Sequence, residues 1–294
     1  MVSEIKRYQA KVMSVLKQRI NTAIIIALVF TTVLFFFNAD AILFFSAVII
    51  IYAGWEWGNL AGYHLFYIKF LYCLFILGIM VLLSFLMGVD RSLPTYINTG
   101  KFILECLIPW WLLAIYWIKS YPRGTIFWGS PLARGIIGLL VLIPVWLALS
   151  ILISLDHGKL LIAGVVLIVA FSDIGAYFAG LRFGKHKLSK NVSPNKTWEG
   201  FLGAIGVNLI FATFLGFFLK IHLMNIMMLF LLVMIIVLSS VIGDLLISMF
   251  KRHRGIKDSG NILPGHGGIL DRIDGHTIAF PIFTLVFIYS NFQV

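Results

Sequence analysis

The chain has 294 residues, of which 61% are hydrophobic and only 12% charged, and it includes 26 phenylalanines. Soluble domains are roughly half apolar and a quarter charged, so this composition excludes an ordinary soluble protein. The formal net charge of +11 suits a phosphate-bearing ligand or an anionic surface. The distribution of lysine and arginine along the chain decides between these two.

The chain begins with a basic segment, residues 1–20, whose apolar residues recur at helical spacing among lysines and arginines. This pattern is typical of an amphipathic helix on an anionic membrane surface. The alternative is a basic flank that only fixes topology, and the sequence favours neither. No small-x-small cleavage pattern follows the first apolar run, so we expect an uncleaved first transmembrane helix rather than a signal peptide.

Apolar runs long enough to cross a bilayer recur along the rest of the chain. A hydrocarbon core of about 30 Å needs roughly 20 apolar residues in a helix. We expect nine transmembrane helices, at 21–37, 41–57, 66–88, 102–118, 135–155, 160–181, 200–220, 225–250 and 276–292. The predicted fold class is therefore all-α, a polytopic membrane protein with no separate soluble domain. Its N-terminal helices occupy 21–155 and its C-terminal region 156–294.

The two cysteines, Cys73 and Cys106, fall in different apolar runs and show no metal-ligand spacing. We expect both to be packing residues.

Two tryptophans, Trp55 and Trp57, lie with Glu56 near the end of the second predicted span. We interpret the tryptophans as part of an interfacial aromatic belt.

Lysine and arginine are distributed unevenly between the predicted loops. About four fifths of the 23 lie in alternate segments, at 1–20, 58–65, 119–134, 182–199 and 251–275. Because positive residues mark the cytoplasmic side of short loops, the N-terminus and these segments are predicted to be cytoplasmic. The net charge is then explained by topology, and we expect no nucleic-acid partner.

Asp173 and Asp244 each lie within a predicted span, about 10–14 Å from its cytoplasmic end at a rise of about 1.5 Å per residue. An aspartate at membrane depth is costly and indicates function by default. The pair could bind a cation or line a polar cavity, as in a transporter. The alternative is that each aspartate pairs with a buried basic residue or with a hydroxyl, Ser172 and Ser240 being nearby.

The segment "LPGHGGILDRIDG" (263–275) places glycines and carboxylates in a predicted cytoplasmic loop. Asp271 and Asp274 are three residues apart, so a helix would present both on one face. Carboxylates suit Mg²⁺, which also coordinates substrate phosphates. The glycines allow backbone N–H groups to approach a phosphate, and His266 is either a phosphate donor or a turn residue.

Basic residues surround these acids in both large cytoplasmic loops. They are Lys185, Lys187, Lys190 and Lys196 in one loop, and Lys251, Arg252, Lys257 and Arg272 in the other. A run of basic residues alone is common next to a membrane-spanning helix. These basic residues are interleaved with acids and glycines, and this arrangement predicts a site for a metal-bound polyphosphate. No Walker motif is present, since "GLRFGK" (180–185) has the wrong glycine spacing.

The segment "SMFKRHRGIKDSGNILPGHGGILDRID" (248–274) resembles the signature of bacterial phosphatidate cytidylyltransferases, also called CDP-diglyceride synthases. It matches S-x-hydrophobic-K-R, then K-D, then P-x-H-G-G-hydrophobic-x-D-R-hydrophobic-D. The resemblance extends to "FSDIGAYFAG" (171–180), "GKHKLSKNVSPNKTWEG" (184–200) and "AGWEWGNLAG" (53–62). The stretch 85–135 contains nothing diagnostic.

The resemblance implies condensation of CTP with phosphatidic acid to give CDP-diacylglycerol and pyrophosphate, with Mg²⁺ or another divalent cation and a possible monovalent cation. It also implies a bacterial inner-membrane enzyme whose site faces the cytoplasm, and it is compatible with a homodimer. We expect metal binding by Asp244 and Asp271 first, with Asp173, Asp258 and Asp274 completing the metal shell or orienting its ligands. The expected catalytic residues are Asp244, Lys257, Asp258, Asp271 and Arg272. The expected substrate-binding residues are Ser193, Asn195, Lys196, Lys251, Arg252, His266, Gly267 and Gly268.

Thr197 precedes an apolar run, so it is expected to contact CTP or to cap the next helix.

Three rival functions are possible for the same residues. A transporter has no need of a glycine-rich loop loaded with carboxylates. A CDP-alcohol phosphotransferase needs further aspartates after "DRIDG", and no acidic residue follows Asp274. A homologue that has lost activity is disfavoured because every expected catalytic position is present.

Overall fold

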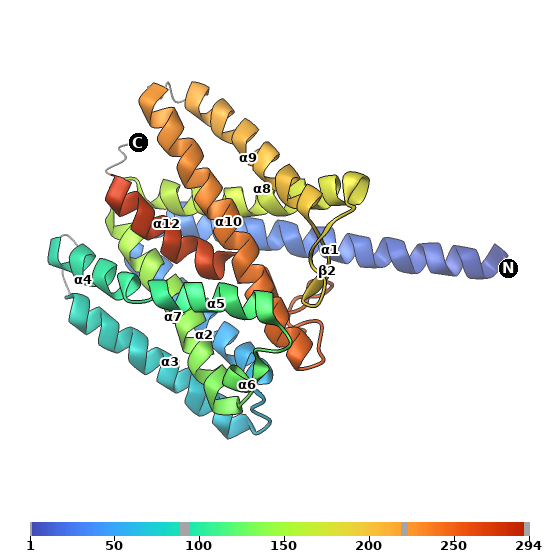
Figure 1. The fold of residues 1–294 in the computed structure, drawn as a ribbon, viewed down its shortest axis with the longest axis horizontal. Coiled ribbons are helices and arrows are strands. Elements are labelled where there is room, and N and C mark those ends of the chain that lie inside the picture. The colour runs from blue at the N-terminus through green and yellow to red at the C-terminus, as the bar shows by residue number, and fades with distance from the viewer. Residues whose placement is uncertain (1, 89–93, 219–222, 291–294) are drawn as a thin grey trace.

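The structure, a computed structural model, describes residues 2–88, 94–218 and 223–290, without the side chains of 2–16, 19, 223 and 224. Twelve helices and one hairpin form the described part of the chain (Figure 1). The elements are α1 (Val2–Phe36), α2 (Ala39–Ala61), α3 (Phe66–Met87), α4 (Pro94–Glu105), α5 (Ile108–Ser120), α6 (Thr125–Trp128), α7 (Pro131–Ser154), α8 (Gly158–Phe183), β1 (Lys187–Ser189), β2 (Ser193–Thr197), α9 (Trp198–Phe218), α10 (Leu223–His253), α11 (Leu270–Ile273) and α12 (His276–Ser290).

The described helices confirm the prediction of a polytopic membrane protein. Eight helical stretches are long and apolar enough to cross a bilayer, when α4 with α5 and α11 with α12 are each counted as one. The shorter apolar stretch Ile20–Phe36 corresponds to the first predicted span. It is the continuation of α1, whose first part covers residues 2–20 of the predicted amphipathic segment. Most side chains of that segment, and hence its amphipathic face, lie outside the described residues.

Two local features differ from the sequence prediction. The loop 182–199 contains an antiparallel hairpin in which Lys187 pairs with Thr197 and Ser189 with Ser193. The predicted span 102–118 is broken at residues 106–107, just before a proline at the start of α5.

The two cysteines are both free but differ in their surroundings. Cys73 is buried, and its thiol lies 3.5 Å from the carbonyl oxygen of Ile51, so its packing role is confirmed. Cys106 lies at the break between α4 and α5 and is exposed, so the prediction that it is a packing residue was wrong.

The core of the bundle forms around α7, which contacts α2, α3, α4, α8 and α12. Fifteen of its residues are buried, and these include Pro144 inside the helix. The helix pair α8–α9 packs closely because small residues meet at its interface: a side chain at Gly203 would clash with the Ala179 methyl group. The helix α10 joins this pair to α12.

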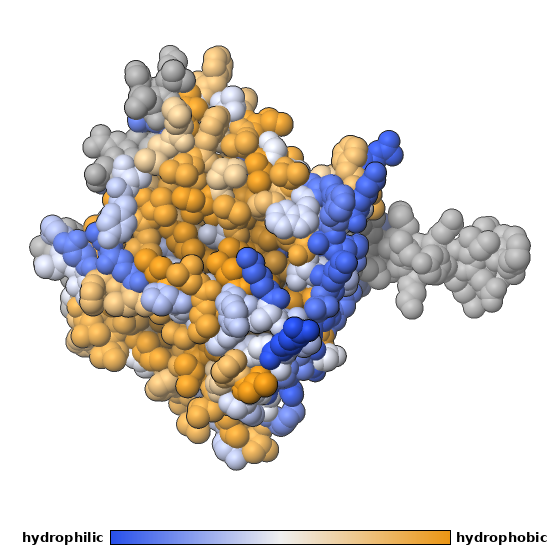
Figure 2. All heavy atoms as spheres, in the orientation of Figure 1, coloured by the Kyte–Doolittle hydropathy of each residue, from blue (hydrophilic) through white to orange (hydrophobic). Residues whose placement is uncertain are grey.

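The loops predicted to be cytoplasmic meet at one end of the bundle. Asn191 donates to the carbonyl of Tyr121 at 3.2 Å, and Arg252 donates to that of Val192 at 3.2 Å. The Thr22 hydroxyl, in α1, donates to the Pro264 carbonyl at 3.0 Å. Figure 2 shows hydrophilic residues gathered at this end beside a broad hydrophobic surface over the helices. We call this the polar end of the bundle.

Candidate active site

The first element of the site is an aspartate–lysine pair between α10 and β2. Asp244 accepts a hydrogen bond at Oδ1 from the Ser248 hydroxyl, one turn along α10, at 3.0 Å. Its other oxygen, Oδ2, forms an ion pair with the Lys196 ammonium. Both side chains are about a quarter exposed, so this pair remains open to solvent and ligands.

The second element is a more deeply buried pair between α11 and the end of α10. Asp271 Oδ1 lies 2.8 Å from the Lys251 ammonium. Asp271 Oδ2 accepts the backbone N–H groups of Ser259 at 2.8 Å and Gly268 at 3.0 Å. The side chains are only 5% and 11% exposed, so the ion pair is nearly closed from water.

Two more carboxylates lie beside these pairs. Asp173 in α8 and Asp274 at the end of α11 both interact electrostatically with Asp244. Lys196 and Arg272 offset the charge of Asp173, and Lys251 offsets that of Asp274. Asp173 and Asp244 therefore interact with each other, whereas their joint binding of a cation stays a prediction.

Close packing of α10 against the start of α12 brings Asp274 to this place. A side chain at Gly243, the residue before Asp244, would come within 2.9 Å of the Thr277 hydroxyl and would also crowd the Asp274 carbonyl. Only glycine fits such an approach without displacing the neighbouring backbone.

The donor chemistry of this group fits a divalent cation. In both Asp244 and Asp271, one carboxylate oxygen is held by a protein donor and the other faces a lysine ammonium. A metal cation could neutralise the charge of this second oxygen in the same way. Among the described residues, no three acidic, histidine or cysteine side chains are close enough to form a metal-binding group by themselves. Mg²⁺ does not need such a cage, because it usually takes one or two carboxylates plus water and substrate phosphates.

A cavity of about 650 Å³ adjoins these residues and is called here the loop cavity. Its lining includes Lys257, Asp258, His266, Gly267 and Arg272, all of which were predicted site residues. The chain turns through left-handed conformations around it, with φ of +74° at Gly265 and +81° at Gly267. A side chain at Gly267 would also come within 2.8 Å of Asp271 Oδ2, so the position requires glycine for two reasons.

The remaining predicted residues are placed around the hairpin and the loop. Ser193 and Asn195 belong to β2, which also contains Lys196. Gly268 uses its N–H for Asp271, so this donor orients the carboxylate instead of facing the loop cavity. The hairpin lysines Lys185, Lys187 and Lys190 have exposed side chains.

Thr197 accepts the backbone N–H of Gly200 at 3.1 Å, which confirms its predicted capping role at the start of α9.

Glu56 is a buried acid beside the site to which the sequence interpretation assigned no role. It is 1% exposed and accepts three hydrogen bonds from the segment 254–275, which contains predicted catalytic residues and is called here the catalytic loop. The donors are the Ser259 hydroxyl at 2.9 Å and the N–H groups of Ile269 at 3.1 Å and Leu270 at 2.8 Å. A side chain at Gly260 or Gly268 would clash with its carboxylate. The available signal was an acid inside an apolar run, the same signal that identified Asp173 and Asp244.

The tryptophan beside Glu56 also corrects a prediction. Trp57 is fully buried, donates to the Arg134 carbonyl at 2.8 Å, and packs on the Phe250 ring at a centroid distance of 5.3 Å. Assigning Trp57 to an interfacial belt was therefore wrong, since its indole N–H has a partner inside the bundle. Trp55 instead packs under the Lys69 ammonium, 5.4 Å from the ring centroid.

Comparison with known proteins identifies the family. The model described as "Cytidylyltransferase family" matches residues 17–290, which include every predicted site residue. This chain belongs to the cytidylyltransferase family. A Pseudomonas aeruginosa protein named phosphatidate cytidylyltransferase is 37% identical over 268 residues, which cover 91% of this chain and 95% of that protein.

Two further relatives bear the same name. The protein from Haemophilus influenzae is 34% identical, over 93% of this chain and 99% of its own length. The protein from Staphylococcus epidermidis is 46% identical over 124 residues, which are 42% of this chain and 47% of that protein.

Proposed function

We propose that the polar end of this molecule catalyses the reaction for which its relatives are named, the transfer of a cytidylyl group from CTP to phosphatidate. The observation that carries the proposal is the pairing of Asp244 with Lys196 and of Asp271 with Lys251 beside the loop cavity. Membership of the cytidylyltransferase family supports the nucleotide half of the reaction. The transmembrane helices support a substrate that resides in the bilayer.

The reaction makes modest demands on proton transfer. A phosphate monoester has a second pKa of about 6, so the attacking oxygen of phosphatidate is largely ionised at neutral pH. That oxygen forms a bond to the α-phosphorus of CTP, and the bond from this phosphorus to the bridging oxygen breaks, with its electron pair leaving on pyrophosphate. Catalysis then requires two anions held in line and their charge offset, which suits a cluster of cations.

We assign roles to the predicted residues on this basis. Asp244 and Asp271 would hold the divalent cation, most simply Mg²⁺, through the oxygens that face the two lysines, and Asp173 and Asp274 would orient or complete that shell. The bound cation would supply electrostatic stabilisation of the phosphate oxygens. The groups that would hold substrate are Ser193, Asn195, Lys196, Lys251, Arg252, Lys257, His266, Gly267 and Arg272. Asp258, in the wall of the loop cavity, would orient them.

The location of the site supports a cytoplasmic reaction in a bacterial inner membrane. The basic loops meet at the polar end, and the bias of lysine and arginine toward these loops predicts that this end is cytoplasmic, where CTP is available. A phosphatidate head group in the inner leaflet would lie at the same level. The homodimer compatible with the family remains a prediction, which the mass of the purified protein in detergent would test.

The test is turnover by the detergent-purified protein supplied with CTP, phosphatidate and Mg²⁺. We expect formation of CDP-diacylglycerol and pyrophosphate, and loss of both products after chelation of the metal. Absence of product from the folded wild-type protein would contradict the proposed activity and would favour the transporter alternative.

A further inference from the structure

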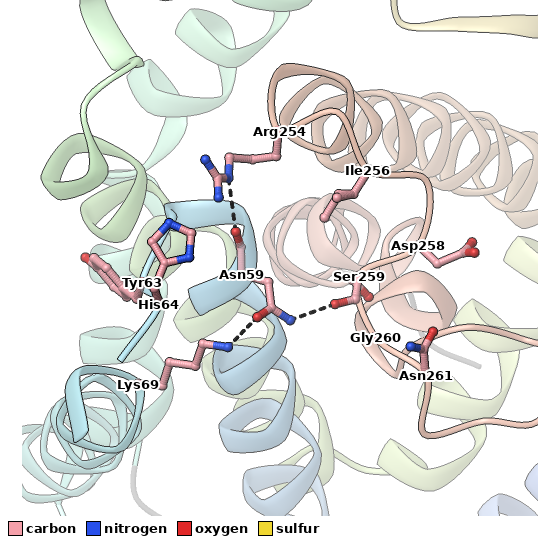
Figure 3. A pocket seen from close by; sticks show the side chains of 10 residues that line it. All are labelled: Asn59, Tyr63, His64, Lys69, Arg254, Ile256, Asp258, Ser259, Gly260 and Asn261. Atoms are coloured by element: carbon pink, nitrogen blue, oxygen red, sulfur yellow. Dashed lines mark hydrogen bonds between the residues drawn. The ribbon is translucent and has the colours of Figure 1, made fainter. Parts of the chain in front are cut away.

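A second cavity lies on the other side of the catalytic loop, between the end of α2, the start of α3 and residues 254–261. It has a volume of about 380 Å³ and is called here the α2–α3 cavity (Figure 3). Its lining includes Asn59, Lys69 and Arg254, and it shares Asp258 and Asn261 with the loop cavity. The two cavities are therefore neighbours that are separated by one short stretch of chain.

The α2–α3 cavity is lined by two basic side chains, Lys69 and Arg254, and by one acidic side chain, Asp258. Lys69 and Arg254 reach Asn59 from two sides: the Lys69 ammonium donates to Asn59 Oδ1, and Arg254 donates to the Asn59 carbonyl at 3.3 Å (Figure 3). No carboxylate forms an ion pair with Lys69 or Arg254 among the described residues. The buried Arg134 lies close by, since both its guanidinium and that of Arg254 approach Gly62.

Asn59 connects this positive group to the catalytic loop. Its side-chain N–H donates to the Ser259 carbonyl at 3.0 Å, and the Ser259 N–H donates in turn to Asp271. The Lys69 stem lies directly on α2, where a side chain at Gly58 would come within 3.1 Å of the Lys69 Cγ atom. The glycine therefore lets the lysine lie across α2 toward the cavity.

The surroundings of Lys69 place the α2–α3 cavity at the membrane surface. In the first turns of α3, Phe66 is 72% exposed, Tyr67 59% and Phe70 50%. Exposed aromatic residues at the end of a membrane-spanning helix lie at the level of the lipid head groups. A lysine at this level usually extends its ammonium outward to water. Here the ammonium instead contacts Asn59 in the cavity wall.

We propose that the α2–α3 cavity binds the phosphomonoester head group of the lipid substrate, with Lys69 and Arg254 as its two cationic contacts. This inference rests on the proposed function and adds the location of the lipid subsite. A phosphate held there would lie next to the loop cavity, across the shared residues Asp258 and Asn261. The two anionic substrates would then approach each other from opposite sides of the catalytic loop.

The experiment separates a lipid phosphate from a nucleotide phosphate. Lys69→Met and Arg254→Gln are assayed in detergent micelles, varying dioleoyl phosphatidate at saturating CTP and then CTP at saturating phosphatidate. Loss of one charge-assisted contact predicts a rise of about tenfold or more in the KM for phosphatidate, with the KM for CTP within about twofold of wild type. Lys69→Arg should recover most of the loss. The matched control is Lys119→Met, which removes an exposed lysine at the end of α5 and should change neither KM.

Binding is also measured without turnover, by titrating soluble dihexanoyl phosphatidate into the purified full chain without CTP. We expect affinity to fall about tenfold in Lys69→Met, with an unchanged elution profile showing that the variant is folded. An unchanged affinity, a rise in the KM for CTP alone, or a fall in kcat with both KM values unchanged would each overturn the inference. An inactive wild-type protein that still binds phosphatidate through Lys69 would overturn the proposed function and leave the subsite intact.

Discussion

The pairs Asp244–Lys196 and Asp271–Lys251 have the same local chemistry in different surroundings. Each carboxylate has one oxygen held by protein donors and one facing an ammonium. The first pair is about a quarter exposed and depends on one serine hydroxyl, whereas the second is nearly buried and joined to two loop amides. The same residue types therefore form an open pair in one place and a pair that also holds loop structure in the other.

The largest expected effect is on turnover, and it should be shared by both pairs. Asp244→Asn and Asp271→Asn should each lower kcat on the order of a hundredfold to a thousandfold, because a metal ligand contributes several kcal/mol to the transition state. The rate of CDP-diacylglycerol formation measures this. Near-normal activity in either variant would contradict its assignment as a metal ligand.

Stability should separate the two pairs. Asp271→Ala leaves the Lys251 ammonium buried without its partner, which costs about 3–5 kcal/mol of unfolding free energy. Asp244→Ala removes a partly exposed pair, for which the expected loss is below about 1 kcal/mol. Denaturant unfolding in detergent measures both values. Equal losses would show that the difference in burial has no energetic consequence.

Glu56 extends the comparison to the support of the buried pair. Glu56→Gln replaces a carboxylate that accepts three loop hydrogen bonds by an amide with a single acceptor oxygen. We expect a loss of about 1–3 kcal/mol in unfolding free energy, together with reduced turnover. Glu105→Gln is the matched control, because Glu105 pairs with Lys101 on the surface at 3.8 Å and should cost less than about 1 kcal/mol. Similar losses in the two variants would argue against a supporting role for Glu56.

A small effect is expected in the element that presents Lys196. Thr197→Ala removes the cap of α9 and should cost about 1 kcal/mol, while Thr197→Ser should retain most of it. Thermal unfolding of the two variants measures the difference. If the serine variant loses as much as the alanine variant, the hydroxyl cap is not the source of the effect.

Much of the fold could be predicted from the sequence because it depends on runs of one residue class. Nine apolar stretches are detectable by length alone, and an aspartate such as Asp244 is conspicuous inside one of them. The break at residues 106–107 and the burial of Trp57 could not be predicted, because each depends on which helix packs alongside.

The candidate site was predictable as a set of residue types but not as a set of pairs. The acids and lysines of both loops were identified, yet the partners of Asp244 and Asp271 lie 48 and 20 residues away along the chain. Glu56 and Ser259 are 203 residues apart, and such contacts follow from the tertiary fold and not from local spacing. Lys69 was assigned no role, since its surroundings are set by α2 and by the loop after α10.

We propose that Asp244 and Asp271, despite their different burial, bind the same divalent cation. Titration of Mn²⁺ into the full chain with CTP and without phosphatidate, followed by electron paramagnetic resonance, tests this directly. We expect Asp244→Asn and Asp271→Asn each to weaken Mn²⁺ binding by about tenfold or more, while Lys119→Met binds as wild type does. Wild-type affinity for Mn²⁺ in both aspartate variants, with both proteins folded, would contradict this proposal.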